Sequence, residues 1–532
     1  MARTVPVFHK KLALSLSIAL ILSGCSVKPQ QLTHQETLTQ AKTDMTTLLL
    51  QAEPVLTPVD LDQAIARAIK HNRERKLQTL EAVLEQGQLD LGNFDMLPKL
   101  TANAGYSQRS NYAASASTTF ENGEPAPLSS SPSYSVSQDK SQTSGNIAFT
   151  WDVLDFGLSY VRAKQQADRY LVAKERERKV IHNIVQDVRN SYYRAVSSER
   201  LLGKIEPLIE QAQAALNDAQ KIELAQAKSP IDALNYQREL LEILRTLQAL
   251  RQDLITAKTE LSVLMGLKPG QQFTLADVNN ANFKVPELKI DIDTMERTAL
   301  VKRPELLESQ YQKRISVEET RAAMLSLLPG ISLNAGAYYD DTKYLKNNEW
   351  TGFGTQVSWN LLNVFRIGSI NKITQLKKDF AEEQALATSM AVLSQVHIAD
   401  IRYEEAGKSY ELADRYLIVS KRISEQMKAS HQLQQTGELE LIRENLNTLL
   451  AELRRDVAYA DLQNSFGRIF VSMGLDLVPE GFGQKSVDEL SKDIGQSFNR
   501  WEDGKLDLVT LQSPATAPQP DVNKVSSKTG KE

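Results

Sequence analysis

Four segments of about ten residues alternate between apolar and polar side chains. In the segment 331–341, the apolar positions are Ile331, Leu333, Ala335, Ala337 and Tyr339. The segments 99–110, 144–154 and 352–362 repeat this alternation. A period of two is typical of a strand with one apolar face, and about ten residues let a tilted strand cross a bilayer. A small soluble sheet would show the same pattern, so it leaves both structures open.

Elsewhere, apolar residues recur at spacings of three and four, which predicts amphipathic helices. Each strand pair is preceded by one predicted helix and followed by a long and a shorter one, near 60–92, 158–227 and 231–265, then near 291–326, 366–435 and 439–473. At 1.5 Å per residue, a helix of about 70 residues is ~105 Å long. We expect a local kink at Pro207. The expected buried side of the first helix comprises Leu61, Ile65, Ala68, Ile69, Leu77, Leu80 and Leu84.

The same order of elements occurs twice. Trp151 and Trp359 lie 208 positions apart (359 − 151), and "LMGL" at 264–267 has the same offset to "SMGL" at 472–475. A tandem duplication therefore organises the chain. We expect a first repeat at 58–267, a linker at 268–290, a second repeat at 291–475 and a C-terminal segment at 476–532, whose last stretch, 513–532, has too little hydrophobic mass to fold.

Four strands cannot close a barrel, and an open sheet edge cannot lie in lipid. If the strands span a membrane, several copies must share one barrel: two copies would supply eight strands and three would supply twelve. Periodicity alone does not choose between these numbers.

The first 24 residues are typical of a secretion signal, because positive residues precede a short apolar run. "LSGC" at 22–25 resembles the lipobox of bacterial lipoproteins, in which the cysteine is acylated, and the following Ser26 favours sorting to the outer membrane. We expect Cys25 to carry lipid and 25–57 to form a lipidated N-terminal segment. An ordinary signal peptide with an incidental cysteine is the alternative.

Together these features resemble one family over residues 58–476. The duplicated unit, "SWNLLN" at 358–363, "KRPEL" at 302–306 and "GL" after the last helix are similar to the TolC family of outer-membrane channel proteins. The resemblance implies a mainly α fold that contributes to a transmembrane β-barrel. It further implies a homotrimer with a twelve-stranded barrel, a periplasmic α-helical tunnel and an equatorial belt, which 268–290 and part of the segment after 476 would build.

The composition adds no catalytic chemistry. The net charge of −4 excludes a strong basic field for nucleic acid. The six histidines never occur at a ligand-like spacing, and no phosphate loop or nucleophile motif is present. We therefore expect no enzyme, no cofactor and no metal site.

Gating residues are expected where the long and shorter helices turn back. The resemblance implies acidic rings and ion pairs at these tips, for which the candidates are Asp232, Glu440, Glu444 and Arg443. Three copies of an acidic residue around an axis would favour cations. Acidic residues on a solvated helix face are the alternative, above all for Glu438. Small-residue notches for a periplasmic adaptor would comprise Ser229, Pro230 and Gly437, with Glu438 beside them, and Trp151 and Trp359 suit a membrane-interface girdle.

With the lipobox, the resemblance implies a lipid-anchored exit duct in the outer membrane, with its tunnel in the periplasm. Its partners would be outer-membrane lipid, a periplasmic adaptor and an inner-membrane transporter of RND, ABC or MFS type. Small-molecule efflux and type I protein secretion are both open as its task. A different class is a periplasmic coiled-coil lipoprotein without a channel, which would not need four two-faced strands.

Overall fold

The computed structural model describes residues 29–50, 55, 57–224, 230–268, 270–276, 283–479 and 481–506. Cys25, Ser229 and the stretch 513–532 lie outside these residues. The chain divides into two compact units, Met1–Pro54 and Val55–Glu532. The first contains the helix α2 (His34–Leu50), where Thr33 and Glu36 cap each other's backbone amides.

The second unit contains both repeats, and their elements follow the predicted order. The first repeat comprises α3 (Leu61–His71), α4 (Arg73–Phe94), β1 (Lys99–Gln108), β6 (Ser141–Asp152), α5 (Val153–Leu224) and α6 (Pro230–Leu264). The second comprises α7 (Ile292–Lys302), α8 (Pro304–Leu325), β7 (Gly330–Asp340), β8 (Glu349–Ser358), η1 (Leu361–Arg366), α9 (Ile367–Gln432) and α10 (Glu438–Ser472). η2 (Phe482–Gln484) and α11 (Val487–Glu502) follow. The strands, long helices and shorter helices lie within a few residues of the bounds that the sequence predicts.

The opening helix of each repeat was predicted as one element, and this is wrong. Asn72 and Arg303 have extended backbones, with ψ of 129° and 128°, and each divides its helix into two. Arg303 precedes Pro304, whose ring disfavours helical geometry at the residue before it. The Asn72 side chain accepts a hydrogen bond from the Arg75 amide at 3.1 Å, which caps the new helix.

The repeated glycine of the "MGL" motifs packs against these helix breaks. Gly266 and Gly474 have positive φ values of 71° and 74°. A Cβ on Gly266 would lie 2.6 Å from the His71 Cβ, and one on Gly474 would lie 2.6 Å from the Lys302 carbonyl. Only glycine allows both the left-handed backbone and this close approach. The motif at the constant offset therefore joins the end of each repeat to its opening helix.

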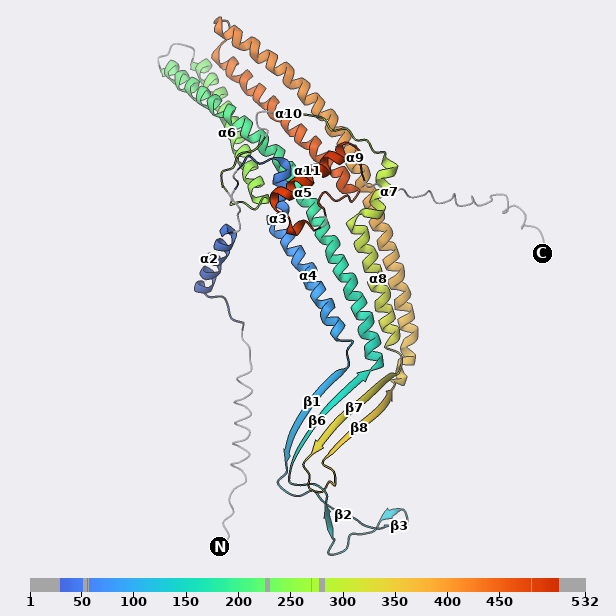
Figure 1. Cartoon of the computed structure of the whole chain (residues 1–532). Coiled ribbons are helices and arrows are strands. Elements are labelled where there is room, and N and C mark those ends of the chain that lie inside the picture. The colour runs from blue at the N-terminus through green and yellow to red at the C-terminus, as the bar shows by residue number, and fades with distance from the viewer. Residues whose placement is uncertain are drawn as a thin grey trace, which may run out of the picture. The chain divides into compact units, whose positions relative to one another are not determined.

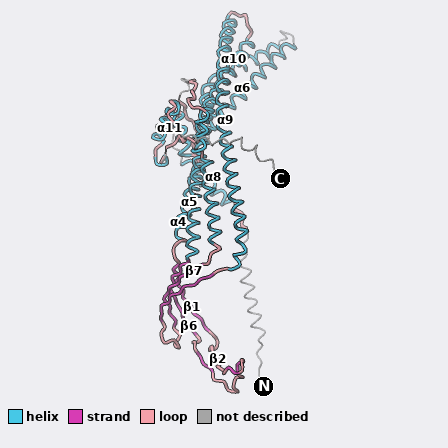
Figure 2. Tube along the Cα trace, turned by 90° about the vertical axis from the view of Figure 1, so that its right-hand side faces the viewer, coloured by secondary structure: helices cyan, strands magenta, loops and turns pink. Residues whose placement is uncertain are grey.

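The helices and the strands form rows in the same order. The strands pair antiparallel as β1–β6–β7–β8, and the helices that lead into or out of them pack as α4, α5, α8 and α9 (Figure 1). In the part of the helices farther from the sheet, the order of packed helices is α6, α5, α10 and α9. Figure 2 shows the strands continuing from one end of the helices. Both rows are open, with β1 and β8 as the edges of the sheet.

The edge helices expose apolar side chains. On α4, Leu77, Leu80 and Leu84 are exposed, although the sequence predicted them to be buried. The reason is that α4 packs on α5 through its other side, where Ala82 is buried and Thr79 bonds to Glu177. At the opposite edge, α9 exposes Ile373, Leu376, Phe380, Leu386 and Met390.

The middle of α5 lies in a core shared with α3 and α11. This core contains Ile65 and Ile69 from α3, Val188 from α5 and Ile494 from α11. α5 continues through Pro207, and a Ser486–Glu489 capping box begins α11. Among the described residues, no helix has both the length and the apolar character that crossing a membrane requires.

The loop between β1 and β6 contains two short hairpins at the end of the sheet away from the helices. They pair β2 (Ala114–Ala116) with β5 (Tyr134–Val136), and β3 (Phe120–Glu121) with β4 (Glu124–Pro125) (Figure 1). The Asp139 carboxylate lies 2.7 Å from the Lys343 ammonium in the loop between β7 and β8. This contact ties the two loops of the sheet together.

Candidate functional site

The register of the sheet separates an apolar face from a polar face. Directly paired residues lie on the same face. Leu100 pairs with Phe149, which pairs with Ala335, which pairs with Phe353, so this row is apolar. Every second row of paired residues projects from the opposite face, which carries Thr101, Asn103, Asn146, Asn334 and Gln356. Each strand presents its apolar side to the same face, as a lipid-facing sheet with an aqueous lumen requires.

Both predicted interface tryptophans lie at the end of the sheet where the strands join the helices. Trp151 is the penultimate residue of β6, and its ring meets that of Phe156 edge to face with centroids 5.9 Å apart. Trp359 follows β8, and its indole nitrogen donates a hydrogen bond to the Leu327 carbonyl at 3.0 Å. Trp151 shares a row with Leu333 and Thr355, and Trp359 follows Thr355 by four residues, so both mark the helix end of the sheet but lie in different rows.

The second hairpin tip carries three of the predicted tip residues. Gly437 caps α10 with an extended backbone, and Glu438 and Glu440 lie in the first turn of α10. Carboxylates at this position interact favourably with the helix dipole. The Glu440 carboxylate folds back over Gly437, where it occupies the space that a Cβ would need. The residue with positive φ in this turn is Gln434, at 58°, and not the glycine.

The first hairpin tip is described from Pro230 onward. Pro230 begins α6, and Asp232 lies exposed in its first turn. Tyr236, one turn farther, faces the other hairpin. Burial and then the charges of Glu438 and Glu440 raise its pKa above the ordinary value of 10.0. The acidic groups of the second tip thus lie near α6 of the first.

An ion pair joins the two hairpins just beyond the tips. The Arg443 guanidinium on α10 bonds to the Glu239 carboxylate on α6, and both side chains are about half exposed. Sequence reasoning named Arg443 but missed Glu239, which is 204 residues away. Glu444, the next residue, is partly buried and accepts a hydrogen bond from the Asn447 amide at 3.4 Å. Arg443 therefore pairs with Glu239 and not with the predicted acids.

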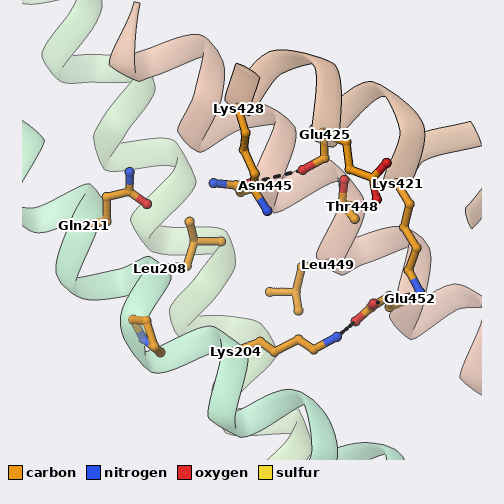
Figure 3. A pocket seen from close by; sticks show the side chains of 12 residues that line it. Lys204, Leu208, Gln211, Lys421, Glu425, Lys428, Asn445, Thr448, Leu449 and Glu452 are labelled. Atoms are coloured by element: carbon orange, nitrogen blue, oxygen red, sulfur yellow. Dashed lines mark hydrogen bonds and ion pairs between the residues drawn. The ribbon is translucent and has the colours of Figure 1, made fainter. Parts of the chain in front are cut away.

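A cavity of about 400 Å³ lies along α10 between α5 and α9. Figure 3 shows Lys204 and Leu208 on one side and Lys421 and Lys428 on the other. At its end, the Lys204 ammonium bonds to the Glu452 carboxylate, and the Lys421 ammonium lies 3.5 Å from it. Burial favours a higher pKa for Glu452, but the hydrogen bond and charges of these lysines hold its pKa below the ordinary 4.5. Glu452, which the sequence did not single out, thus joins both hairpins.

A second charged group lies where the chain leaves α10. Asp476 accepts from the His182 ring at 2.8 Å and from the Arg178 guanidinium at 2.9 Å. Burial favours a higher pKa for Asp476, but these two hydrogen bonds and their charges lower it below 3.8. Arg178 also donates to the carbonyls of Lys302 and Gly474, at 3.3 Å each, so it stabilises the second helix break. This arrangement has a structural role.

The comparisons with known proteins fit this architecture. No protein-family model matches the chain. The cation efflux system protein CusC of Escherichia coli O157:H7 is 24% identical over 273 residues, which cover 51% of this chain and 54% of that protein. The chain thus matches about half the length of this curated relative.

Solved structures match over much more of the chain. The Campylobacter jejuni CmeC outer membrane channel aligns with a TM-score of 0.60 and 14% identity, over 82% of this chain and 89% of CmeC. A crystal structure of CusC aligns with a TM-score of 0.59 and 17% identity, over 81% of this chain and 96% of CusC. The chain has the fold of an outer-membrane channel. This channel fold confirms the predicted fold class: a mainly helical chain with one four-stranded sheet, open in the single copy.

The channel fold does not locate a gate by itself. Of the sequence candidates, the structure brings Glu438 and Glu440 near Tyr236 and leaves Asp232 exposed on the other tip. The described residues contain no group of three or more His, Cys, Asp or Glu side chains that could hold a metal ion. What the arrangement offers chemically is charge and shape at the tips and on the polar face of the sheet.

Proposed function

We propose that three copies of this chain form an exit duct through the outer membrane, with the helical tunnel in the periplasm. One observation carries the proposal: in the part of the chain that the structure describes, both edges of the open rows lack a partner. β1 and β8 have unpaired backbone edges, and α4 and α9 expose apolar side chains beside them. The two edges differ, so one copy's α4 edge meets another copy's α9 edge. Such a head-to-tail contact closes into a ring.

The ring brings the strands of all copies into one barrel, whose apolar face meets lipid and whose polar face lines the lumen. Four strands per copy and the trimer of the resembled family give twelve. Pairing β1 with a neighbouring β8 would satisfy the edge hydrogen bonds that lipid cannot satisfy. Trp151 and Trp359 would then lie at one membrane interface, and acylated Cys25 would anchor each copy.

The duct serves the export of small molecules delivered by an inner-membrane transporter through a periplasmic adaptor. Two matched proteins, CusC and CmeC, carry the names of a cation efflux system protein and an outer membrane channel, and this supports efflux. The tips would contact the adaptor through Ser229, Pro230, Gly437 and Glu438. Asp232, Glu440, Glu444 and Arg443 would control the closed end.

Conductance and oligomeric state test the duct. Protein extracted from outer membranes should migrate as a heat-sensitive trimer and conduct ions in planar bilayers. Leu80→Glu on α4 should reduce the fraction of protein that migrates as a trimer, because it places a charge in the apolar contact between copies. Val317→Glu on α8, also an exposed apolar site but inside the row, is the matched control. A monomeric protein that conducts no ions would exclude the duct.

A deletion strain separates the two transport tasks. Loss of efflux should increase sensitivity to small toxic compounds and leave the secreted proteome unchanged. Loss of a secreted protein with unchanged sensitivity would instead assign the duct to type I secretion.

A further inference from the structure

Two aromatic residues interrupt the polar face of the sheet. Tyr338 on β7 pairs directly with Trp350 on β8, so both side chains project from the same face. On β1, β6, β7 and β8 this face otherwise carries glycine, alanine, lysine, and uncharged polar or acidic residues. Every other aromatic residue of these strands belongs to the apolar face. A large aromatic surface on the polar side does not serve the contact with lipid.

The two rings form a stacked pair on a base of glycines. Their centroids are 5.5 Å apart and their planes differ by 11°. The Tyr338 ring covers Gly336 and Gly352, since a Cβ on either glycine would lie 3.2 Å from it. Tyr338 is thereby held in place and half-buried, whereas Trp350 remains 45% exposed. The pair therefore presents a fixed indole surface to whatever occupies the space over the polar face.

A carboxylate lies on the same face, two residues along β7. Asp340 is about 7 Å from Tyr338 along the strand, by the rise of two residues. Its carboxylate accepts hydrogen bonds from the Gln142 amide and from the Thr342 backbone at 2.9 Å. Both donors are neutral, and no cationic side chain of the described residues forms an ion pair with Asp340. Its negative charge is therefore available to a bound cation.

The row that contains the aromatic pair also offers amides. Asn103 pairs with Asn146, and Asn146 pairs with Tyr338, so these amides extend the row across the sheet. Amide groups donate and accept hydrogen bonds, which suits the polar substituents of a flat compound. One level of the polar face thus combines an aromatic surface, amides and a nearby carboxylate.

We propose that Trp350, supported by Tyr338, is a binding site for planar aromatic cations. The compound stacks on the indole, which attracts a cation through its ring face, and its positive charge lies toward Asp340. The inference rests on the proposed function, because the polar face lines the path of exported compounds only in the closed duct. It assigns the duct a preference for this chemical class, with one site in each copy.

Block of the ion current by ethidium, a planar aromatic cation, tests the site. The full-length protein from outer membranes is placed in planar bilayers, and the concentration that halves the current is measured. Trp350→Ala should raise that concentration about five- to tenfold, the range expected for a lost cation–π and stacking contact. Trp350→Phe should recover part of the block, and Asp340→Asn should weaken block by ethidium more than block by a neutral planar dye.

Phe353→Ala is the matched control, since Phe353 lies on β8 but on the apolar face and is exposed. It should leave ethidium block unchanged. If wild type conducts and Trp350→Ala is blocked as strongly as wild type, the site is overturned and the pair only packs over its glycines. If wild type does not conduct, the proposed duct fails, and quenching of tryptophan fluorescence by ethidium tests the site instead. Quenching that is present in wild type and reduced in Trp350→Phe would support the site. Equal quenching in both proteins would overturn it.

Discussion

Arg443 on α10 forms an ion pair with Glu239 on α6, and this pair joins the second repeat to the first repeat beside the hairpin tips. Both side chains are about half exposed, and such a pair contributes about 0.5 kcal/mol. Three pairs in a trimer would contribute about 1.5 kcal/mol to the closed arrangement, roughly a tenfold change in an equilibrium constant.

We predict that Arg443→Ala increases the open fraction of the duct up to about tenfold. Single-channel recording in planar bilayers measures this fraction. Arg245→Ala is the control, because Arg245 is exposed on the same helix as Glu239 but pairs with Glu242 within that helix. The charge swap Glu239→Arg with Arg443→Glu should return the open fraction toward wild type, and an unchanged open fraction in Arg443→Ala would remove the pair from gating.

The tip carboxylates should determine block by multivalent cations. Replacing Glu440 and Glu444 together by Ala removes two negative charges per copy from the second tip, so block of the current by a trivalent cation should weaken at least tenfold. Glu242→Ala, an exposed carboxylate on α6, should leave the block unchanged. Equal block in the double variant and wild type would place both residues away from the pore.

Gly474→Ala should destabilise the protein by about 3 kcal/mol or more. A methyl group there would meet the Lys302 carbonyl at 2.6 Å, and the φ of +74° adds strain. Gly481→Ala separates the two effects, since Gly481 has the same φ and open space around it; it should cost only about 1 kcal/mol. Thermal unfolding measures both, and equal losses would mean that the contact with the helix break does not matter.

The stability of the protein should depend on the protonation of Asp62, which lies in the first turn of α3. Burial and the neighbouring charge of Asp60 raise the pKa of Asp62 to about 6, and Arg189 opposes this only in part. A raised pKa means that the folded protein binds the proton more tightly than the unfolded chain. The stabilising effect of the proton is complete below about pH 4 and is lost as the pH rises through about 6.

Asp62→Asn, which keeps the shape without the charge, should therefore stabilise the protein by about 1–2 kcal/mol above pH 7 and have little effect near pH 4. Unfolding free energies measured from pH 4 to 8 provide the comparison. Asp60→Asn should remove part of the pH dependence, because it deletes the neighbouring charge, while asparagine keeps the cap that Asp60 forms with the Gln63 amide at 2.7 Å. A pH-independent difference between wild type and Asp62→Asn would contradict the raised pKa.

Local patterns predicted the elements, and they missed features that depend on partners. The break at Arg303 had a visible signal in Pro304, and Asn72 is a typical capping residue, but the continuous apolar pattern obscured both. Leu80 was assigned to the core because its spacing matches Ile69, yet α5 contacts a different side of α4. The sequence did not single out Glu452, which becomes a buried link between the two hairpins only because α5 and α9 bring Lys204 and Lys421 to it.

The sequence by itself determined the duplicated order of helices and strands, the approximate lengths of the strands and of the long and shorter helices after them, and the two faces of the sheet. These features follow from the spacing of apolar residues along the chain, which is three or four positions in a helix and two positions in a strand. Only the tertiary structure decided which apolar edges remain open, that Arg443 pairs with Glu239 and that Tyr338 stacks on Trp350. Burial and pairing depend on which distant segments pack together, and local spacing carries no information about that choice.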